Sequence, residues 1–371
     1  MSCPEKQFFV VADLVLPLLH TLLQLHKHLC TRFRSSILRI LFLSNVALQA
    51  AGQQALKGKP PAAAYSAPSF TPLTIGGTHS QLHLCFCTSW SEVSAAGQAR
   101  VLWIPALDTY LTNAGCSEQQ RQVVAKLQES LGGAKLYPPL AWEDLFEHKD
   151  RVYSLFGSDY MLPTRWVPLP SLAEVQRAAD SMLANLPDGS YMVKGSFSYG
   201  ALTANRVEVA GGKCDRLLEV LTNLYSLQHQ RCVGIQKYLQ ALSDFELRVF
   251  VVPDLKSPGG WRQCVGVATE MTPDGRMKAE QRQPVNGRPL AIARFIDELL
   301  TRHSAAFRRA LELKMPLLRL DCGYANDKCF LNELCCPGDS TLFSEMHAQD
   351  LACVVGKAFA GQMLELLFGF P

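Results

Sequence analysis

The chain has 371 residues, of which 48% are hydrophobic, so it is long enough to bury more than one core and to fold as two or three lobes of a soluble globular protein. Its formal net charge is +3, and the Lys and Arg residues of the C-terminal part are scattered among Asp and Glu. This distribution excludes nucleic acid as the default partner. Two apolar runs near the N-terminus, Leu14–Leu25 and Ile37–Ala51, are shorter than the ~20 residues that a membrane span requires, so we expect no span.

The thirteen cysteines do not have the spacing of a zinc site or of a disulfide framework. Cys85 and Cys87 are separated by one residue, and Cys335 and Cys336 are adjacent, so no paired CxxC knuckles are present. Isolated cysteines in a large core behave as small hydrophobic residues. The pattern predicts reduced thiols and a cytoplasmic protein.

Residues 1–75 differ in composition from the rest of the chain. No Asp or Glu occurs between Leu14 and Ser91, whereas basic residues, Ser, Ala and Leu are frequent. Three interpretations remain open: a removable transit peptide, which would make the protein organellar; a helical extension of the fold; or a segment present only because of the chosen start codon. The Pro-, Ala- and Ser-rich segment Lys59–Thr74 is typical of a linker.

Residues 76–148 are predicted to form a small N-terminal α/β lobe. Apolar runs at Leu82–Cys87 and Ala99–Ile104 indicate strands, and Ser117–Leu131 has the apolar spacing of a helix. A Gly-Gly pair directly after that segment is typical of a helix end.

Residues 149–239 are predicted to form a second lobe of mixed helices and strands. Ser171–Leu186 has helical apolar spacing, with Ser171 as N-cap and Glu174 three positions later, which together predict a capping box. The other expected elements are a helical stretch that ends at Phe156, strands at Arg165–Pro168, Tyr191–Lys194 and Val233–Leu239, and a helix near Cys214–Leu227.

Residues 240–371 are predicted to form a third lobe. Strands at Phe245–Val252 and Cys264–Met271 flank Pro258-Gly259-Gly260, which predicts a hairpin. The further expected elements are a long helix over Pro289–Leu313, a strand at Leu317–Asp321, a turn at Ala325–Lys328, a strand at Cys329–Leu334 and a closing helix over Ser344–Leu367.

Lys194 ends an apolar strand and is followed by a loop of small residues, Gly195–Gly200. A Lys in this place puts a cation near phosphate oxygens, and Gly and Ser let backbone N–H groups close over them. The same pattern also fits an ordinary hairpin turn.

Gln236 and Glu246 lie at the ends of two consecutive predicted strands. Exposed strand-end backbone beside Gln236 is suited to an adenine edge, and Glu246 could accept hydrogen bonds from ribose hydroxyls. The alternative is an edge strand, since Glu246 and Arg248 share one face at period two and would form a surface ion pair worth little.

Asp321 and Glu333 belong to two predicted antiparallel neighbours joined by a polar turn. Two carboxylates close together are costly unless a hard cation such as Mg²⁺ neutralises them. An exposed acidic sheet edge is the alternative. The segment Pro337–Thr341, before the closing helix, is suited either to an anionic group or to an ordinary helix cap.

Taken in order, these residues resemble the signature of the ATP-grasp superfamily over about 220 of the 371 residues. The resemblance implies an α+β ATP-grasp fold in which two lobes clamp ATP, preceded by the small α/β lobe. It rests on Lys149, the Lys194–Ser196 loop, Gln236–Leu239, Glu246, Arg319-x-Asp321, and Asn332-Glu333 with Pro337-Gly338.

The resemblance also implies a role for each matching residue. Lys149 and Lys194 would contact the phosphates of ATP, and the Ser196–Gly200 loop, with Ser196, Ser198 and Gly200, would be a mobile lid. Arg319 would stabilise the transferring phosphoryl group as the catalytic residue. Adenine would lie beside Gln236, Lys237, Tyr238 and Leu239, the ribose beside Glu246, and Mg²⁺ on Asp321 and Glu333.

Cys335 departs from the family pattern, which commonly has Asn two residues after the second carboxylate. A thiol is a poor ligand for Mg²⁺, so the metal would be held differently, or Asn332 or water would substitute, or activity would be altered. The leading hypothesis is an ATP- and Mg²⁺-dependent ligase that activates a small-molecule or peptide carboxylate as an acyl phosphate for attack by an amine or other nucleophile. Two alternatives are an ATP-binding assembly factor without ligase activity and a phosphotransferase acting on a hydroxyl.

Overall fold

The structure is a computed structural model. It describes residues 6–13, 36–43, 73–76, 80–87, 101–103, 117–130, 135–137, 141, 145–146, 148–197, 205–226, 230–271, 277–282, 287–315 and 317–335. The chain divides into two compact units. The first contains Met1–Thr112, Ser117–Leu140 and Thr341–Pro371, and the second contains Asn113–Cys116 and Ala141–Ser340.

The first unit contains a six-stranded sheet in the order β3-β4-β2-β1-β5-β6. All neighbouring pairs are parallel except the edge pair of β3 and β4, which is antiparallel. Helix α5 of this unit has Val123, Val124 and Leu127 buried along one face at helical spacing. The bounds are β1 Lys6–Asp13, β2 Ser36–Leu43, β3 Leu73–Gly76, β4 Ser80–Cys87, β5 Val101–Trp103, α5 Ser117–Ser130 and β6 Lys135–Tyr137.

Strands β1 and β2 differ from one of the three interpretations of residues 1–75, that of a helical extension. They pair in parallel over eight residues each and occupy the two central positions of the sheet. A continuous apolar run is typical of a strand buried on both faces of a parallel sheet, and such a run is easily taken for a helix. The small α/β lobe therefore contains strands from before residue 76. The apolar run Leu14–Leu25 and the segment Lys59–Thr74 lie, apart from β3, outside the described residues.

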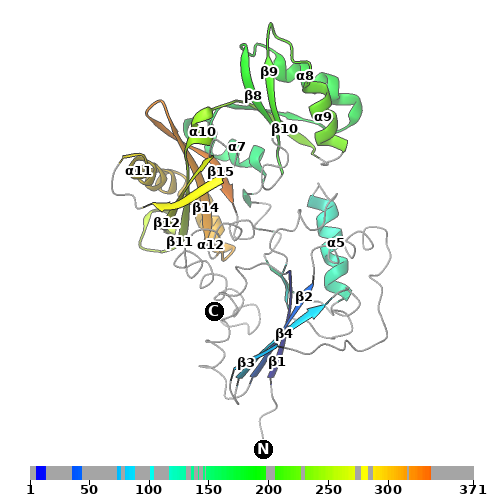
Figure 1. Ribbon diagram of the computed structural model, residues 1–371, viewed down its shortest axis with the longest axis vertical. Helices are drawn as coiled ribbons and strands as arrows, with labels where there is room; N and C mark the ends of the chain where they lie inside the picture. The colour runs from blue at the N-terminus through cyan, green and yellow to red at the C-terminus, as the bar shows by residue number, and fades with distance from the viewer. Residues whose placement is uncertain are drawn as a thin grey trace, which may run out of the picture. The chain divides into compact units, whose positions relative to one another are not determined.

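The second unit begins with a four-stranded antiparallel sheet in the order β7-β10-β8-β9. Figure 1 shows helices α8 and α9 against this sheet. Apolar residues of the sheet, among them Val193 and Ile235, form one buried core with Met182 of α8 and Leu221 of α9. The bounds are α7 Lys149–Tyr160, β7 Thr164–Pro168, η1 Leu172–Glu174, α8 Val175–Leu183, β8 Gly189–Gly195, β9 Asn205–Val209, α9 Leu217–Ser226 and β10 Cys232–Lys237.

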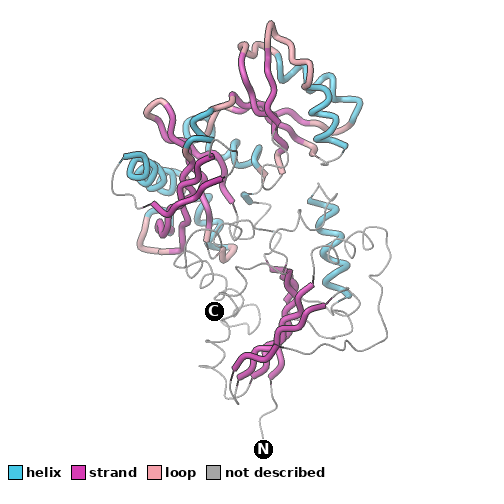
Figure 2. Tube along the Cα trace, in the orientation of Figure 1, coloured by secondary structure: helices cyan, strands magenta, loops and turns pink. Residues whose placement is uncertain are grey.

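The second unit also contains a five-stranded antiparallel sheet in the order β13-β12-β11-β14-β15. The two sheets of this unit are drawn as separate groups of magenta strands in Figure 2. Trp261, Phe250 and Phe307 are among its most deeply buried side chains. The bounds are α10 Gln240–Asp244, β11 Glu246–Pro253, η2 Pro258–Gly260, β12 Trp261–Met271, β13 Met277–Arg282, α11 Gly287–Arg302, α12 Ser304–Glu312, β14 Leu318–Ala325 and β15 Lys328–Cys335.

Two predicted helices differ in the structure. The expected helix Ser171–Leu186 is a short 3-10 turn followed by α8, and the Ser171 side chain makes no cap hydrogen bond. The expected helix Pro289–Leu313 is broken into α11 and α12 at His303. The ring of His303 packs edge-on against Tyr160 at 4.9 Å, so a tertiary contact accompanies the break.

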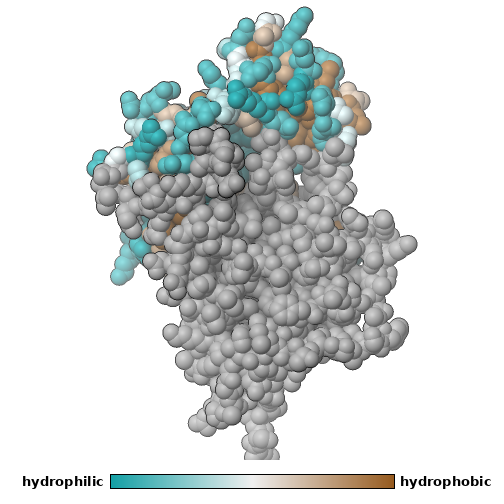
Figure 3. Space-filling model, in the orientation of Figure 1, coloured by the Kyte–Doolittle hydropathy of each residue, from teal (hydrophilic) through white to brown (hydrophobic). Residues whose placement is uncertain are grey.

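The predicted hairpins are present. The turn Ala325–Lys328 joins β14 to β15 with Asn326 and Asp327 at positive φ, and Pro258–Gly260 separates β11 from β12. The predicted closing helix Ser344–Leu367 lies outside the described residues. Among the helices that the structure describes, none is both long and apolar enough to cross a membrane. On the face shown in Figure 3, most described residues are hydrophilic.

Candidate functional site

Two lysines are held next to each other by the segment that follows β8. Lys194 is the next-to-last residue of β8, and Lys149 is the first residue of α7. The backbone N–H of Lys149 donates to the carbonyl of Ser196 at 2.8 Å, and His148 forms an isolated bridge with Phe197. The expected pair of cationic side chains is therefore brought together by backbone pairing between the start of α7 and residues 196–197.

Two carboxylates lie opposite each other in the other sheet of the same unit. Asp321 of β14 is the register partner of Glu333 of β15, as the predicted antiparallel pair requires. Oε1 of Glu333 lies 2.9 Å from Nζ of Lys149. This ion pair joins the start of α7 to the acidic strand pair, so one cluster contains both lysines and both carboxylates.

Arg319 is buried together with the metal candidates. Its Nε and Nη2 atoms donate to the two oxygens of Asp321 at 2.8 and 2.9 Å, and Nη2 lies 3.0 Å from Sγ of Cys335. Both Arg319 and Asp321 are at most 2% exposed. A buried ion pair of this geometry is rigid, because breaking it leaves an uncompensated charge.

Glu246 lies in the carboxylate cluster. Its carboxylate accepts hydrogen bonds from Nε of Arg248 at 3.0 Å and from Nδ2 of Asn332 at 2.8 Å, and the charge of Asp321 acts on it. It is not among the residues that line the pocket described below. The structure therefore places Glu246 beside the expected metal residues, and its contact with the ribose stays a prediction.

Burial and neighbouring charges shift the pKa values of the side chains in this cluster. Burial lowers the pKa of Lys194 from 10.5 to about 8, and the nearby ammonium of Lys149 lowers it too, while Glu333 and Glu246 act in the opposite direction. Burial would raise the pKa of Glu333, but the charges of Lys149, Arg319 and Lys194 bring it below its usual value.

The pKa of Glu246 is shifted in the opposite direction from that of Glu333. Burial raises its pKa, and the negative charge of Asp321 raises it further, against the opposing effects of Arg248 and Asn332. Carboxylates that share a site are expected to separate in pKa in this way.

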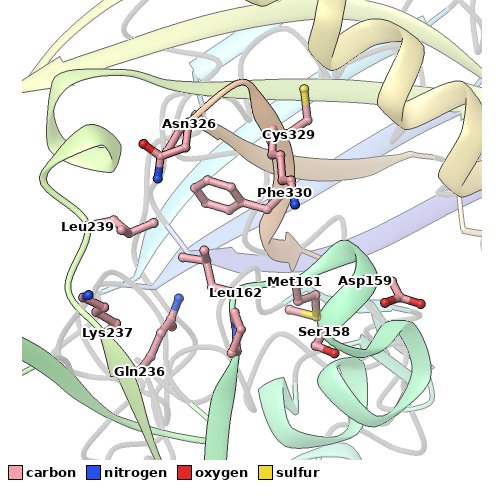
Figure 4. A pocket seen from close by; sticks show the side chains of 13 residues that line it. Ser158, Asp159, Met161, Leu162, Gln236, Lys237, Leu239, Asn326, Cys329 and Phe330 are labelled. Carbon is pink, nitrogen blue, oxygen red and sulfur yellow. The ribbon is translucent and has the colours of Figure 1, made fainter. Parts of the chain in front are cut away.

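A pocket of about 670 Å³ extends along the second unit beside the expected adenine residues. Figure 4 shows the side chains of Leu239, Leu162 and Phe330 around its centre, with Gln236 pointing in from β10. Lys237 also lines this pocket. Its full lining is Ser158, Asp159, Met161, Leu162, Pro163, Gln236, Lys237, Leu239, Ala325, Asn326, Lys328, Cys329 and Phe330.

The remaining predicted residues have other surroundings. Tyr238 is not part of the pocket lining; its hydroxyl donates to Gln240, and the guanidinium of Arg206 stacks over its ring at 4.3 Å. The buried hydroxyl of Ser196 donates to Asp150. Ser198 and Gly200 lie outside the described residues.

Asp321, Glu333 and Cys335 form a group of possible metal ligands. One ligand atom from each residue lies within 4.8 Å of the others. The two carboxylates suit Mg²⁺, whereas the thiol does not, because Mg²⁺ takes oxygen ligands. By their oxygen ligands, the residues that fit Mg²⁺ are Asp321 and Glu333.

Several residues of the site were not expected from the sequence. Phe330 lines the pocket, and its ring lies where a Cβ on Gly323 would clash at 2.3 Å. Asp150 accepts from Ser196, and Gln230 binds the backbone of Phe197. Asp150 directly follows Lys149, so its place near the site could have been predicted from the sequence. The role of Gln230 could not, because its hydrogen-bond partner Phe197 is 33 residues away in the chain.

No model of a known protein family matches the chain, and no curated protein matches it. Two solved structures are similar in fold. One is D-cycloserine synthetase DcsG, with 14% identity and a TM-score of 0.50 over 96% of this chain and 100% of that chain. The other is the VanG D-Ala:D-Ser ligase from Enterococcus faecalis, with 12% identity and a TM-score of 0.50 over 98% of this chain and 99% of that chain.

These similarities show the fold, which is the ATP-grasp fold predicted from the order of the motifs. Its two antiparallel sheets with their helices form the second unit, and the parallel α/β sheet belongs to the first. Fold alone does not establish an activity, so the function has to be argued from the side chains of the site.

Proposed function

We propose that the protein binds ATP with Mg²⁺ in the second unit and uses it to activate a carboxylate as an acyl phosphate, which an amine or another nucleophile then attacks. The observation that carries the proposal is the ion pair between Lys149 and Glu333 beside Lys194. It gathers residues of both sheets and of α7 into one charged cluster, and these are the residues to which the resemblance assigns the phosphates and the metal.

The charges of the cluster support a polyanionic ligand. Four cationic side chains face three carboxylates, so the described cluster has an excess of positive charge. A phosphate chain would add negative charge to this partly buried region, and a divalent ion on Asp321 and Glu333 would offset part of it. The cations are Lys149, Lys194, Arg248 and Arg319, and the carboxylates are Glu246, Asp321 and Glu333.

The pocket supports a base-binding role. Phe330 and Leu239 provide apolar surface, while Gln236 and the strand-end backbone near it provide polar groups, as a nucleobase requires. Phe330 lies on β15, which also carries Glu333. We assign the adenine ring to this pocket and the phosphates to the lysine cluster.

Within this proposal each residue has a separate task. Lys149 and Lys194 bind the phosphates, and Asp321 and Glu333 hold Mg²⁺, which supplies charge neutralisation when it is bound. Arg319 fixes the carboxylate of Asp321 through both oxygens and adds positive charge near the transferring group. Glu246, with Arg248 and Asn332, supports the metal residues. We assign it this role in place of the ribose contact predicted from the sequence.

The partner of ATP in this proposal is a small-molecule or peptide carboxylate. The D-Ala:D-Ser ligase, whose structure is similar in fold, is named for two amino acids, which makes amino acids and short peptides the first carboxylates to test. The choice among them depends on loops that vary between members of one fold.

A second candidate is a nucleotide-binding assembly factor without ligase activity. The observation that favours it is the full engagement of Asp321 by Arg319, together with Cys335 in place of an oxygen ligand. In such a protein the guanidinium would take the place of one metal ion.

A turnover screen separates the two candidates. Purified full-length protein is incubated with ATP and Mg²⁺ against a panel of amino acids and short peptides, and release of ADP and phosphate is measured. A ligase releases them only when a carboxylate and a nucleophile are both present. Binding of ATP in calorimetry without turnover on any carboxylate supports the assembly factor, and absence of ATP binding contradicts both.

A further inference from the structure

Gln230 continues the hydrogen-bond ladder of β10 with its side chain. The backbone N–H of Ser196 donates to the carbonyl of Cys232 at 2.9 Å, as in the regular pairing of β8 with β10. One step further, the N–H of Phe197 donates to Oε1 of Gln230 at 3.0 Å, and Nε2 of Gln230 donates to the carbonyl of Phe197 at 2.5 Å. A side-chain amide thus holds the backbone of Phe197 by both of its polar groups.

The side-chain amide of Gln230 is closely packed. Gln230 is 3% exposed, and its own N–H donates to the carbonyl of Leu224 in α9. A Cβ on Gly195 would lie 2.4 Å from Oε1 of Gln230, so only glycine allows the amide to approach this closely. Buried polar groups that are fully bonded fix a local structure, because every alternative leaves a donor or acceptor unsatisfied.

The segment held by Gln230 is connected to both phosphate lysines of the proposed site. Lys194 directly precedes it, and the carbonyl of Ser196 accepts the N–H of Lys149 at 2.8 Å. The ring of Phe197 also packs against His148 with centroids 4.9 Å apart. The distance between the two lysines therefore depends on where residues 195–197 are held.

We propose that Gln230 is a positioning residue for the nucleotide phosphates: by fixing the backbone of Phe197, it sets the position of Lys149 against Lys194. This inference rests on the proposed function, since it assigns the two lysines to phosphates. Gln230 itself does not touch the ligand. Its action is carried by the bridge between residues 196–197 and the start of α7.

The test compares three variants of the full-length protein by calorimetric titration with MgATP. Gln230→Leu keeps the approximate volume and removes both hydrogen bonds, and Gln230→Asn keeps an amide that is too short to reach both backbone atoms. Gln263→Leu is the matched control, because Nε2 of Gln263 donates to the carbonyl of Ala293 at 2.7 Å and to Asp297 at 2.8 Å in the other sheet. Thermal unfolding of each variant shows whether it is folded.

We expect both Gln230 variants to weaken ATP binding about tenfold or more, while the control stays within about twofold of wild type. The decisive readout is a double-mutant cycle with Lys149→Ala. If Gln230 acts by positioning Lys149, its loss adds little once that lysine is gone, whereas a purely structural effect adds in full. The control cycle of Gln263→Leu with Lys149→Ala should be additive.

Two results would overturn the inference: wild-type ATP affinity in both folded Gln230 variants, or full additivity with Lys149→Ala. If Gln230→Leu does not fold, the cycle with Gln230→Asn gives the same decision. A failure of the proposed function has a different signature, because then Lys149→Ala and Lys194→Ala themselves leave ATP affinity unchanged. Such a result removes the basis of both proposals, whereas an effect of the lysines without an effect of Gln230 removes only this one.

Discussion

Burial disfavours the charged form of the Lys194 side chain and lowers its pKa. Residues with pKa values shifted in this way cluster at sites that bind ligands or react. We expect Lys194→Ala to weaken ATP binding about a hundredfold, the effect of losing a charge-assisted contact of roughly 3 kcal/mol. Lys213→Ala is the control, since Lys213 is exposed in the turn after β9. Calorimetric titration at one salt concentration gives both affinities. Equal affinities in the two variants would contradict the phosphate role of Lys194.

The lowered pKa of Lys194 predicts a pH dependence of the same binding step. With a pKa of about 8 in the free protein, the side chain is charged below that pH and neutral above it. Phosphates bind the charged form, so affinity should fall as pH rises through 8, and binding above pH 8 should take up a proton. Titrations in buffers of different ionisation enthalpy measure this uptake. Lys194→Met should abolish it; persistence of the uptake in that variant would assign it to another group.

Asp321 and Glu333, the two proposed metal ligands, should contribute differently to the free energy of unfolding. Asp321 and Arg319 form a buried bidentate pair, so Asp321→Asn should lower the free energy of unfolding by roughly 3–5 kcal/mol. Glu333 is partly exposed and pairs with Lys149, so Glu333→Gln should cost less stability. Both variants should need more Mg²⁺ for ATP turnover.

Urea unfolding and Mg²⁺ titrations of turnover measure these two effects. Cys335→Asn is the comparison, because it supplies an amide oxygen in place of a thiol and should leave turnover unchanged or raise it. Wild-type Mg²⁺ dependence in both carboxylate variants would mean that the pair is only an acidic cluster compensated by Arg319 and Lys149.

The order of strands and turns predicted that the two carboxylates lie close together, but it did not predict the irregularity in the pairing of their strands. Asp321 and Glu333 were predicted as neighbours because they belong to two consecutive strands joined by a polar turn. The register shifts between Asp321 and Cys322, which leaves Asn332 without a direct partner in the ladder and lets it reach Glu246. A shift of this kind is not visible in the alternation of residue types.

At the level of elements, helices and strands with a strong local apolar pattern were predicted from the sequence. Elements whose formation or ends depend on contacts with distant residues were not. Strand β9 was missed because its five residues follow a small-residue loop, and only pairing with β8 buries Val207 and Val209. The break at His303 was missed because apolar spacing continues from α11 into α12. Contacts of His303 with Phe156 and Tyr160 lie outside any local window.

Helix α7 contains a break that the sequence explains. Gly157 has φ 71° and ψ −177°, a backbone conformation that is nearly restricted to glycine. We expect Gly157→Ala to lower the free energy of unfolding by roughly 1–3 kcal/mol, although a Cβ there meets no atom within 4 Å. The cost is therefore backbone strain and not a clash. Urea unfolding measures it, with Ser158→Ala, at the exposed neighbouring position, as the control; equal stabilities would contradict the strain.

For the whole molecule, composition separated the N-terminal part from the rest but did not indicate its strands. A helical extension was one of three interpretations of the residues before 76, whereas the structure contains β1 and β2 at the centre of a mainly parallel sheet. Strands β4 and β5 were predicted from their apolar runs, but parallel pairing joins segments that are far apart in the chain, so local patterns could not show that they pair with β2 and β1.

The division into two units predicts how ATP binding depends on the N-terminal part. Every described residue assigned to ATP or Mg²⁺ lies between Lys149 and Glu333, within the second unit. Removal of residues 1–75 would delete β1, β2 and all of β3 but its last residue from the six-stranded sheet, so the first unit should lose its fold. We expect a fragment of residues 141–340 to unfold in one cooperative transition and to bind MgATP within about threefold of the full chain, because the charged cluster and the pocket are complete in it.

Circular dichroism during urea unfolding and calorimetric titration test this fragment, with its Lys194→Ala variant as the binding control. Retained affinity that Lys194→Ala removes would show that the clamp is a property of the second unit. A folded fragment that fails to bind MgATP, while the full chain binds it, would mean that residues of the first unit complete the nucleotide site, and the assignment of ATP to the second unit alone would be wrong.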